Sequence, residues 1–342
     1  MSTFRQIVLG SLLFCFVLTL QAQDPVFSQF YSAPLQLNPA FAGTTYAPRI
    51  SLIYRNQWSV FEGGFQTYAA SYEQSIERLN SGFGVSVQSD NAADIYTTNN
   101  FKAVYGYRVQ INRDWAIKLG VEAGLIQTNL NWDKLIFGDQ LDEIDGYDED
   151  NPILSEEVRP ENLNKSSFDV GAGLLLYNRG FYAGLALHHL NTPDESLLEI
   201  NQNLNVGLPM RMTFHIGGQI TLEEGNKRNP GAFISPSLIV IRQGDFGQIN
   251  GGALVGFGKF YGGLWYRHAW SNADAGIATL GYRHGVFRIG YSYDATISDL
   301  AAEASGTGGT HEISFLISLD DSQSLKRRRK KAELNDCFKI FN

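Results

Sequence analysis

The fold is decided by a stretch of regularly alternating residues, TNNFKAVYGYRV, at positions 98–109. From position 101 onward the odd positions hold apolar side chains or alanine, whereas Lys102 and Arg108 lie at even positions. Alternation with a period of two places the two kinds of side chain on opposite faces of a β-strand. Residues 115–125 repeat the pattern, with Glu122 among the polar positions. Both stretches predict strands with one apolar and one charged face.

The same alternation continues through most of the chain, and helical periodicity is nearly absent. It predicts fourteen strands. The expected strands are 48–58, 65–76, 80–90, 98–110, 114–129, 165–178, 180–190, 208–221, 230–242, 246–257, 259–270, 275–284, 285–294 and 309–319. An even number of antiparallel strands is typical of bacterial outer-membrane barrels.

The lengths of the connections separate a membrane barrel from a soluble β-sandwich, which alternation alone does not do. Connections after even-numbered strands are mostly short, such as 77–79, whereas those after odd-numbered strands are mostly longer, such as 130–164 and 191–207. Short periplasmic turns and long external loops produce this asymmetry. Two connections depart from it, because 222–229 is long and 243–245 is short.

We therefore predict an all-β fold, an up-and-down transmembrane antiparallel β-barrel of about 14 strands over residues 48–319, with both termini in the periplasm. Closure of the barrel removes the unpaired strand edges that hydrocarbon does not tolerate. Aromatic side chains are expected to face lipid. Charged side chains are expected to line the lumen, namely Arg49, Arg55, Lys102, Arg108, Lys118, Glu122, Arg211 and Arg288.

Residues 1–22 have the pattern of a secretory signal peptide, with Arg5 before an apolar run at 7–20 and cleavage expected after Ala22. The run is short for a membrane helix, which needs about 20 apolar residues. No later segment of the sequence supplies such a helix. Export to the outer membrane of a Gram-negative bacterium is the localisation that this pattern and the predicted barrel favour.

The two cysteines do not predict a disulfide framework. Cys15 lies inside the apolar run, and Phe14 occupies the position where a lipoprotein signal needs a small residue. Removal of the signal peptide leaves Cys337 alone, and one cysteine cannot form an internal disulfide. A large core or a closed sheet must therefore stabilise the fold.

Composition narrows the classes of function. The net charge is −8 at pH 7, which disfavours binding to the anionic backbone of nucleic acids. The chain contains 35 glycines, 16 tyrosines and 22 phenylalanines but only 3 methionines. Glycine-bearing strands flanked by aromatic residues account for this composition better than a helical core does.

The segment 23–47 combines three prolines with many apolar side chains. The prolines exclude a regular helix or a central strand, and the apolar side chains are too many for a free linker. Two interpretations stay open, a periplasmic strap or plug that packs inside the barrel and a docking site for a periplasmic partner. The candidate partner-binding residues are Phe27, Phe30, Tyr31, Asn38, Pro39 and Phe41.

The tail 320–342 contains six consecutive cations, and four of them are further candidates for partner binding. These four are Lys326, Arg327, Arg328 and Arg329. One interpretation is a disordered basic tail. The other is electrostatic contact, in the periplasm, with an acidic partner or with anionic lipid headgroups.

The connection 131–164 holds eleven acidic residues against Lys134 and Arg159. A solvated external loop explains such a charge run. Calcium is the alternative, since aspartates supply the hard oxygen ligands that it prefers. The candidates are Asp139, Asp142, Asp145, Asp148 and Asp150. Their spacing does not fit a calcium loop, because the glycine of that motif would be Gly146 and Leu141 would then have to be acidic. No cofactor is therefore expected.

The six histidines are not expected to hold a metal. His188 and His189 are neighbours on a predicted strand, so they should face opposite sides unless a bulge intervenes. The others, His215, His268, His284 and His311, lie on different strands, where we expect hydrogen-bonded histidines of a polar lumen. The sequence lacks a Gly-x-Ser-x-Gly elbow and a phosphate-binding glycine loop. We expect no enzyme, although a serine–histidine pair across strands stays open, because such sites are recognised by geometry.

Both ends of the predicted barrel carry motifs of a known family. The segment 24–43, with its core LNPAFAG at 37–43, resembles the opening of the PorP/SprF family of Bacteroidetes outer-membrane proteins. YSYD at 291–294, ISDL at 297–300 and GGTHEIS at 308–314 resemble the closing hairpin of the same family. The resemblance spans essentially the whole mature barrel.

The resemblance implies a role in the type IX secretion system or its gliding-motility branch, in the secretion and cell-surface retention of large adhesin-type protein substrates. It implies periplasmic and outer-membrane secretion components as partners, and it brings no catalytic residues. An outer-membrane porin or solute uptake channel is the alternative function, in which the charges of the lumen select solutes.

Overall fold

The computed structural model describes residues 23–45, 47–61, 63–142, 147–148, 153–195, 197, 207–225, 231–298 and 307–319. One antiparallel sheet contains all the described strands. The strands are β1 (Arg49–Gln57), β2 (Phe65–Ile76), β3 (Ser81–Ala92), β4 (Tyr96–Gln110), β5 (Ala116–Leu130), β6 (Asn164–Tyr177), β7 (Phe181–His188), β8 (Arg211–Gly218), β9 (Ile220–Thr221), β10 (Phe233–Gln243), β11 (Phe246–Phe257), β12 (Phe260–Ala269), β13 (Ala273–His284), β14 (Phe287–Thr296) and β15 (Thr310–Ser318).

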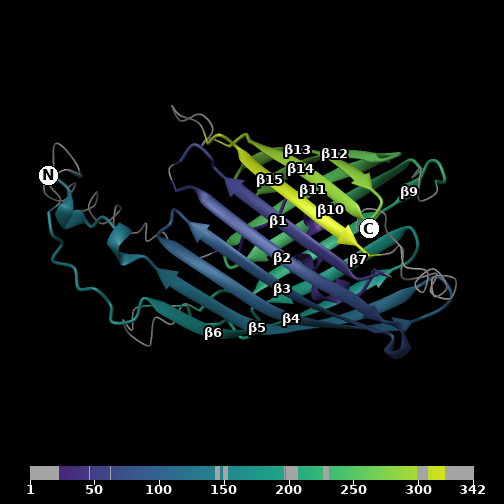
Figure 1. Ribbon diagram of the computed structural model, residues 1–342, viewed down its shortest axis with the longest axis horizontal. Helices are drawn as coiled ribbons and strands as arrows, with labels where there is room; N and C mark the ends of the chain where they lie inside the picture. Colours follow the sequence, from purple (N-terminus) through teal and green to yellow (C-terminus); the bar gives the residue numbers. More distant parts are fainter. Residues whose placement is uncertain are drawn as a thin grey trace, which may run out of the picture.

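The sheet closes on itself as a barrel (Figure 1). Each strand pairs with its sequence neighbours, except that β8 pairs with β10 and not with β9. β1 also pairs with β15 from Arg49↔Ser318 to Gln57↔Thr310. Short β8 and β9 both pair with β10, so they are two parts of one transmembrane strand and the barrel has fourteen. Closure leaves no sheet edge in hydrocarbon, where unpaired backbone groups would find no water. The predicted barrel and strand number are confirmed.

The two connections that departed from the expected asymmetry are real features. β10 and β11 are joined by Gly244 and Asp245 alone, and Gly244 has φ +57°, a conformation that suits glycine in a tight hairpin. The connection between β9 and β10 covers residues 222–232. The strand bounds around these connections therefore agree with those expected from the sequence.

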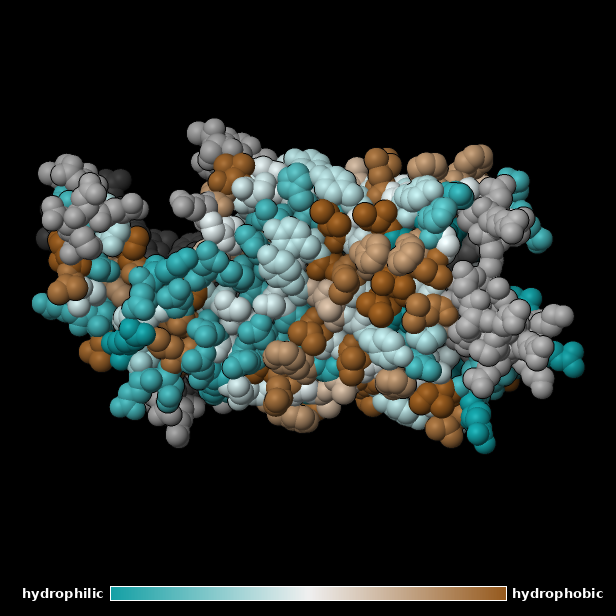
Figure 2. All heavy atoms as spheres, viewed as in Figure 1, coloured by the Kyte–Doolittle hydropathy of each residue, from teal (hydrophilic) through white to brown (hydrophobic). Residues whose placement is uncertain are grey.

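The alternation of side chains separates the lumen from the outer surface. Five of the predicted lumen charges are buried inside the barrel, namely Arg49, Arg55, Lys118, Glu122 and Arg288. Apolar side chains of the other parity are exposed on the outside. Figure 2 shows them as a band of hydrophobic residues across the strands. The band is the surface that faces lipid.

The helices of the described chain are short. Three lie in the N-terminal segment, η1 (Phe30–Ser32), α2 (Pro34–Leu37) and η2 (Pro39–Phe41). The others are η3 (Glu77–Leu79), η4 (Trp132–Lys134) and η5 (Gly138–Gln140). Within the described residues, no helix has the length and apolar character needed to cross a membrane.

The two ends of the described chain lie at opposite ends of the barrel. We call the end with the connections after β1, β3, β5, β7, β10, β12 and β14 the loop end, and the other the turn end. Asp24 N donates to the side chain of Gln243, the last residue of β10 at the loop end. Leu319 N donates to Pro48 O at the turn end. The described chain therefore enters the barrel at the loop end and leaves it at the turn end, because the N-terminal segment runs through the lumen. The chain termini themselves lie outside the described residues, and the expectation that both are periplasmic stays a prediction.

A cation on the outer surface should destabilise the barrel according to its depth. Leu264 lies in the middle of β12 and is 72% exposed, and Phe257 ends β11 and is also 72% exposed. We expect Leu264→Arg to cost about 2–4 kcal/mol of folding free energy in liposomes and Phe257→Arg only about 0–1 kcal/mol. Urea titration followed by the electrophoretic shift of the folded barrel measures both. Equal losses of folding free energy in the two variants would contradict the depths assigned to Leu264 and Phe257 in the membrane.

Candidate functional site

The lumen is occupied by the N-terminal segment, residues 24–45, which we call the plug. It begins beside the loop ends of β7 and β10, where Asp24 contacts His189 and Gln243. It crosses the lumen and reaches the turn end, where Gly43 N donates to Glu73 in β2. The chain then enters β1. The plug is the feature that distinguishes this barrel from an empty cylinder.

Proline and asparagine give the plug its shape. Pro34 and Pro39 each occupy the first turn of a short helix, where the missing N–H group has no cost. The side chain of Asn38 accepts a hydrogen bond from Ala40 N and so caps η2. Its Nδ2 atom donates to Leu174 O and lies 2.9 Å from His215 Nε2. Asn38 therefore fixes both the helix and its position on the wall.

Glycines on the inner face of the wall make room for the plug. A Cβ atom on Gly120 would lie 2.2 Å from the backbone nitrogen of Ala40. A Cβ atom on Gly173 would lie 2.0 Å from Asn38 Oδ1. Contacts under 3 Å force atoms to shift, so these strand positions accept only glycine while the plug is in place. The glycine-rich strands of the sequence are explained in part by this close approach.

Aromatic side chains of the plug pack against the opposite wall. Tyr31 stacks on Trp265 with ring centroids 5.9 Å apart. The guanidinium of Arg288 lies 5.1 Å from the Tyr31 ring centroid and 4.4 Å from that of Tyr261. Such cation–π contacts help to hold a buried arginine in place. The part of the lumen around Tyr31 and Trp265 is thus a packed core.

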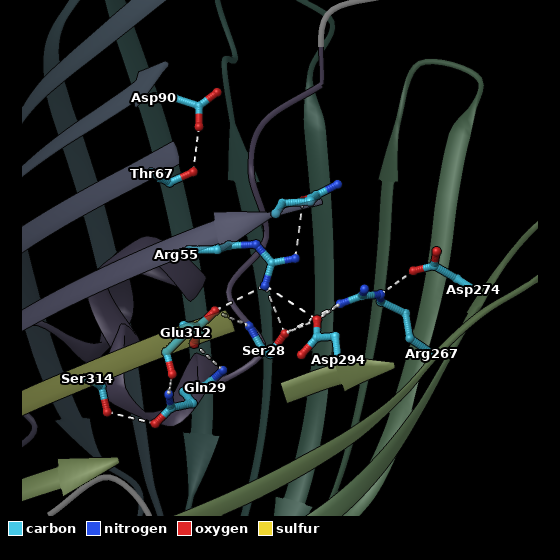
Figure 3. Close-up of polar contacts among 11 residues, drawn as sticks. Ser28, Gln29, Arg55, Thr67, Asp90, Arg267, Asp274, Asp294, Glu312 and Ser314 are labelled. Carbon is cyan, nitrogen blue, oxygen red and sulfur yellow. Dashed lines mark hydrogen bonds and ion pairs between the residues drawn. The ribbon is translucent and has the colours of Figure 1, made fainter. Parts of the chain in front are cut away.

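A cluster of charged side chains binds the plug near the loop end (Figure 3). The carboxylate of Glu312 accepts from the backbone nitrogens of Ser28, at 2.9 Å, and Gln29, at 2.7 Å. Arg55 contacts Glu312 at 3.2 Å and the Ser28 hydroxyl at 3.0 Å. Asp294 accepts from Ser28 Oγ at 2.6 Å. Side chains from β1, β14 and β15 therefore contact two plug residues, Ser28 and Gln29.

Arg267 extends this cluster to β12. Its guanidinium contacts Asp294 at 2.9 Å and also pairs with Asp274. Buried charges are stable only when each has a partner, and loss of one partner leaves the other buried and uncompensated. The cluster therefore couples the position of the plug to the seam where the barrel closes, between β1 and β15.

A second group of charges holds the first residue of the plug. Asp24 contacts His189 Nε2 at 2.7 Å and Arg211 at 2.9 Å. Burial opposes ionisation of Asp24, but Arg211 and His189 hold its pKa well below the usual range. Burial also disfavours a charged imidazole, but Asp24 and Asp169 raise the pKa of His189 to about 9. His189 is therefore a cation at neutral pH.

This second group continues along the wall. Asp169 accepts from His189 Nδ1 at 3.0 Å and contacts Lys102 at 3.0 Å. Lys102 also pairs with Glu122 at 2.7 Å, and Glu122 contacts His188 at the same distance. At the turn end a separate ion pair joins Arg49 to Glu73. The predicted lumen charges thus act mainly as anchors for the plug and for one another.

The predicted partner-binding residues divide into two sets. The plug residues Phe27, Phe30, Tyr31, Asn38, Pro39 and Phe41 are all buried inside the barrel. This arrangement corresponds to the plug interpretation, and a partner would reach these side chains only after the segment leaves the lumen. The other set, Lys326, Arg327, Arg328 and Arg329, lies outside the described residues.

The histidine predictions need correction. His188 and His189 do not face opposite sides, because β7 ends at His188 and His189 adopts φ +56°, so both rings are buried in the lumen. His215 also lies in the lumen. The remaining three lie on the outer face, where they contact the hydroxyls of tyrosines. These three are His268, His284 and His311.

The acidic connection shows no metal geometry where it is described. Asp139 accepts from Ser155 Oγ and Glu156 N, so its carboxylate organises the loop. Asp145 and Asp150 lie outside the described residues. Among the residues that the structure describes, no group of three His, Cys, Asp or Glu side chains is placed to hold a metal ion.

Sequence reasoning missed the wall residues that receive the plug, above all Asp294, Glu312 and Glu73. A signal was present, because each is a carboxylate at an inward position of a strand. Glycines at inward positions, such as Gly120 and Gly173, were a second signal. Inward carboxylates and inward glycines both mark positions where the wall contacts a segment inside the lumen.

A side chain at Gly120 should displace the plug. We expect Gly120→Val to raise the maleimide reactivity of a cysteine introduced by Ser32→Cys at least tenfold, in a Cys337→Ser background, because the added atoms overlap Ala40. Gly276→Val in β13 is the matched control, since a Cβ there meets nothing within 4 Å. Equal reactivity in the two variants would show that the plug does not rest on Gly120.

Docking of the first plug residue should weaken at high pH. Because the pKa of His189 is raised to about 9, its pairing with Asp24 contributes fully below the unperturbed value near 6.5 and is lost as pH rises through 9. We expect Asp24→Asn to lower stability more at pH 7 than at pH 10, with a difference of at most about 3 kcal/mol. Thermal unfolding at both pH values measures it, and a pH-independent cost would contradict the pairing.

Solved structures similar to this chain are bacterial barrels. The Acinetobacter baumannii outer membrane protein Omp33 aligns over 81% of this chain and 100% of its own, with 8% identity and a TM-score of 0.44. The TodX deltaS2S3 mutant monoaromatic hydrocarbon channel aligns over 83% and 92%, with 11% identity and a TM-score of 0.45. Likenesses at this level carry no argument about function. Comparison with curated proteins gives no match.

A family model matches residues 19–317, a span that includes the plug and nearly the whole barrel. The model is described as the type IX secretion system membrane protein PorP/SprF. This match agrees with the resemblance of the terminal motifs, and with the closed barrel it places the protein in the outer membrane. The chain therefore belongs to the PorP/SprF family of type IX secretion system membrane proteins.

Proposed function

We propose that the protein is a non-enzymatic scaffold of the type IX secretion or gliding machinery, which assists the export and cell-surface retention of large protein substrates. In this proposal the loop end faces the cell exterior and the turn end faces the periplasm, as is usual for bacterial barrels. The barrel fixes the protein in the membrane. Binding, without chemical catalysis and without a cofactor, carries the function.

The packed lumen is the observation that carries this proposal. The plug residues Tyr31, Ala40 and Phe41 have no exposed surface, and wall side chains contact them from several strands. A porin needs a continuous aqueous path through its lumen. Here interior side chains and the plug fill the part of the lumen around Tyr31 and Phe41. The observation supports a scaffold over the alternative of a solute channel.

The connections at the loop end suit a role in holding exported protein. The longest described connection follows β5 and is strongly acidic. The strands β5 and β6 flank it, and β3 to β6 are longer than the adjoining β7 and β8. Long loops on a rigid scaffold are common binding elements. We assign this end to the substrate.

The turn end suits contact with the periplasmic machinery. β15 ends at Ser318, and the basic tail follows it in the sequence. A run of six cations favours an acidic surface or anionic lipid headgroups as its partner. We assign the tail to periplasmic or outer-membrane components of the secretion system.

Conductance and co-purification together test the proposal. In planar bilayers we expect the wild-type barrel to show no steady open state, because the plug fills the lumen. A variant lacking residues 24–45 should conduct. Pull-down of the wild-type protein from native membranes should recover a large surface protein and secretion components, identified by mass spectrometry.

The control for the pull-down is a variant with alanine at all six cations of the tail. It should lose the machinery components but keep the exported substrate. A steady pore in the wild-type protein, together with recovery of lipopolysaccharide alone, would reject the scaffold in favour of the uptake channel.

A further inference from the structure

The outer face of β2 to β6 carries residues in register across five strands. One row, which we call the apolar row, consists of Ala70, Val87, Phe101, Leu125 and Phe168. Toward the loop end the next row, the lower polar row, consists of Tyr68, Ser89, Asn99, Gln127 and Ser166. Above it the upper polar row consists of Gln66, Asn91, Thr97, Asn129 and Asn164.

The change from the apolar row to the polar rows marks the edge of the hydrocarbon. The side chains Phe101, Leu125 and Phe168 of the apolar row are 46%, 51% and 58% exposed, as expected for residues in contact with lipid. Successive rows lie two residues apart, about 7 Å along the strands. The strands β3 to β6 thus continue beyond the lipid boundary as a wall with a polar outer face. Figure 2 shows hydrophilic surface beside the hydrophobic band at this end of the barrel.

The two polar rows contain only hydroxyl and carboxamide side chains, without a single charge. Within the described part of the chain, Tyr68 bonds to Gln66, and Asn91 bonds to Asp94. The other seven side chains hold no hydrogen bond to described residues, so their donors and acceptors are available. The inner face of the same strands is different, since it carries Asp90 and Lys165.

The polar rows lead into a cavity of about 320 Å³ at the tips of β4 and β5. Thr97, Asn99 and Asn129 line it from the rows, and Trp132 adds an aromatic ring from η4. The charges at its margin are paired. Asp133 contacts Arg159 at 3.0 Å, and Asp94 contacts Lys134 at 3.2 Å. The rest of the lining consists of neutral polar groups, the apolar side chains Ile95, Leu130 and Leu163, and the aromatic ring of Trp132.

This chemistry selects a class of ligand. A carboxamide both donates and accepts hydrogen bonds, and so does a hydroxyl, which matches the many hydroxyls of a sugar. The face of an aromatic ring packs against the apolar side of a sugar ring. The rows themselves offer no charged partner to an ionic ligand. The surface also lies immediately above lipid, at the level of the headgroups.

We propose that the polar rows and the adjoining cavity bind a neutral saccharide chain of the glycolipid that surrounds the barrel in the outer leaflet. This inference rests on the orientation in the proposed function, in which the loop end faces the exterior. Binding along the rows would hold the wall of β3 to β6 upright beside the acidic loop, which in that proposal contacts the exported substrate.

Calorimetric titration of the purified full-length protein tests the inference. The probes are the glycolipid extracted from the producing bacterium and the two fragments that mild acid hydrolysis releases, its saccharide and its lipid. We expect the released saccharide to bind the wild-type protein and the double variant Asn99→Ala/Asn129→Ala to weaken that binding at least tenfold. The double variant Gln74→Ala/Tyr107→Phe, on the outer face near the turn end, is the matched control and should change the affinity less than twofold.

The inference is overturned if the saccharide does not bind, if both double variants bind it like the wild type, or if only the lipid fragment binds. Replacement of the ring by Trp132→Ala should also weaken binding and gives a second test in another element. Orientation is tested separately by Ser166→Cys in a Cys337→Ser background. We expect a membrane-impermeant maleimide to label this cysteine in intact cells. Labelling only after permeabilisation would also overturn the inference. Loss of the export role alone would leave saccharide binding by the purified protein unchanged.

Discussion

The absence of water in hydrocarbon is the constraint on which the rest of this structure depends. Every backbone N–H and C=O group in the membrane must find its partner inside the protein, so the sheet must close. The pairing of β1 with β15 satisfies that requirement. Closure then creates an interior, and an interior lined by inward-facing charges has to be either hydrated or filled.

This chain fills it with its own N-terminal segment. The plug supplies backbone N–H groups and hydroxyls to wall carboxylates such as Glu312 and Asp294, and the wall supplies glycines where the plug approaches most closely. The charged clusters are therefore part of the packing of the lumen. Because they lie on strands from both sides of the seam, the plug and the closure of the barrel stabilise each other.

The barrel is also asymmetric around its circumference. β3 to β6 are longer than β7 and β8, and the surplus length carries neutral polar residues outside and charged ones inside. The taller wall of β3 to β6 stands directly beside the shorter β7 and β8, and the acidic connection follows β5 within the taller part. The family role in secretion, the packed lumen and this tall wall all suit a protein that presents surfaces to partners.

Much of the fold follows from the sequence, because alternation is a local property that survives wherever a strand has two unlike faces. The fourteen strands, the lipid-facing aromatics and inward charges such as Arg49 and Glu122 could all be predicted in this way. The prolines and aromatics of the plug also indicated that the segment had to pack on something.

Only the tertiary structure decided where that segment goes and what it meets. Glu312 and Ser28 are 284 positions apart in the chain, and no local pattern relates them. The common orientation of His188 and His189 depends on one left-handed residue at the end of a strand. The polar rows depend on the register of five strands. The sequence by itself determined the faces of each strand, since they depend on adjacent residues, whereas pairings between distant residues were determined by closure of the barrel.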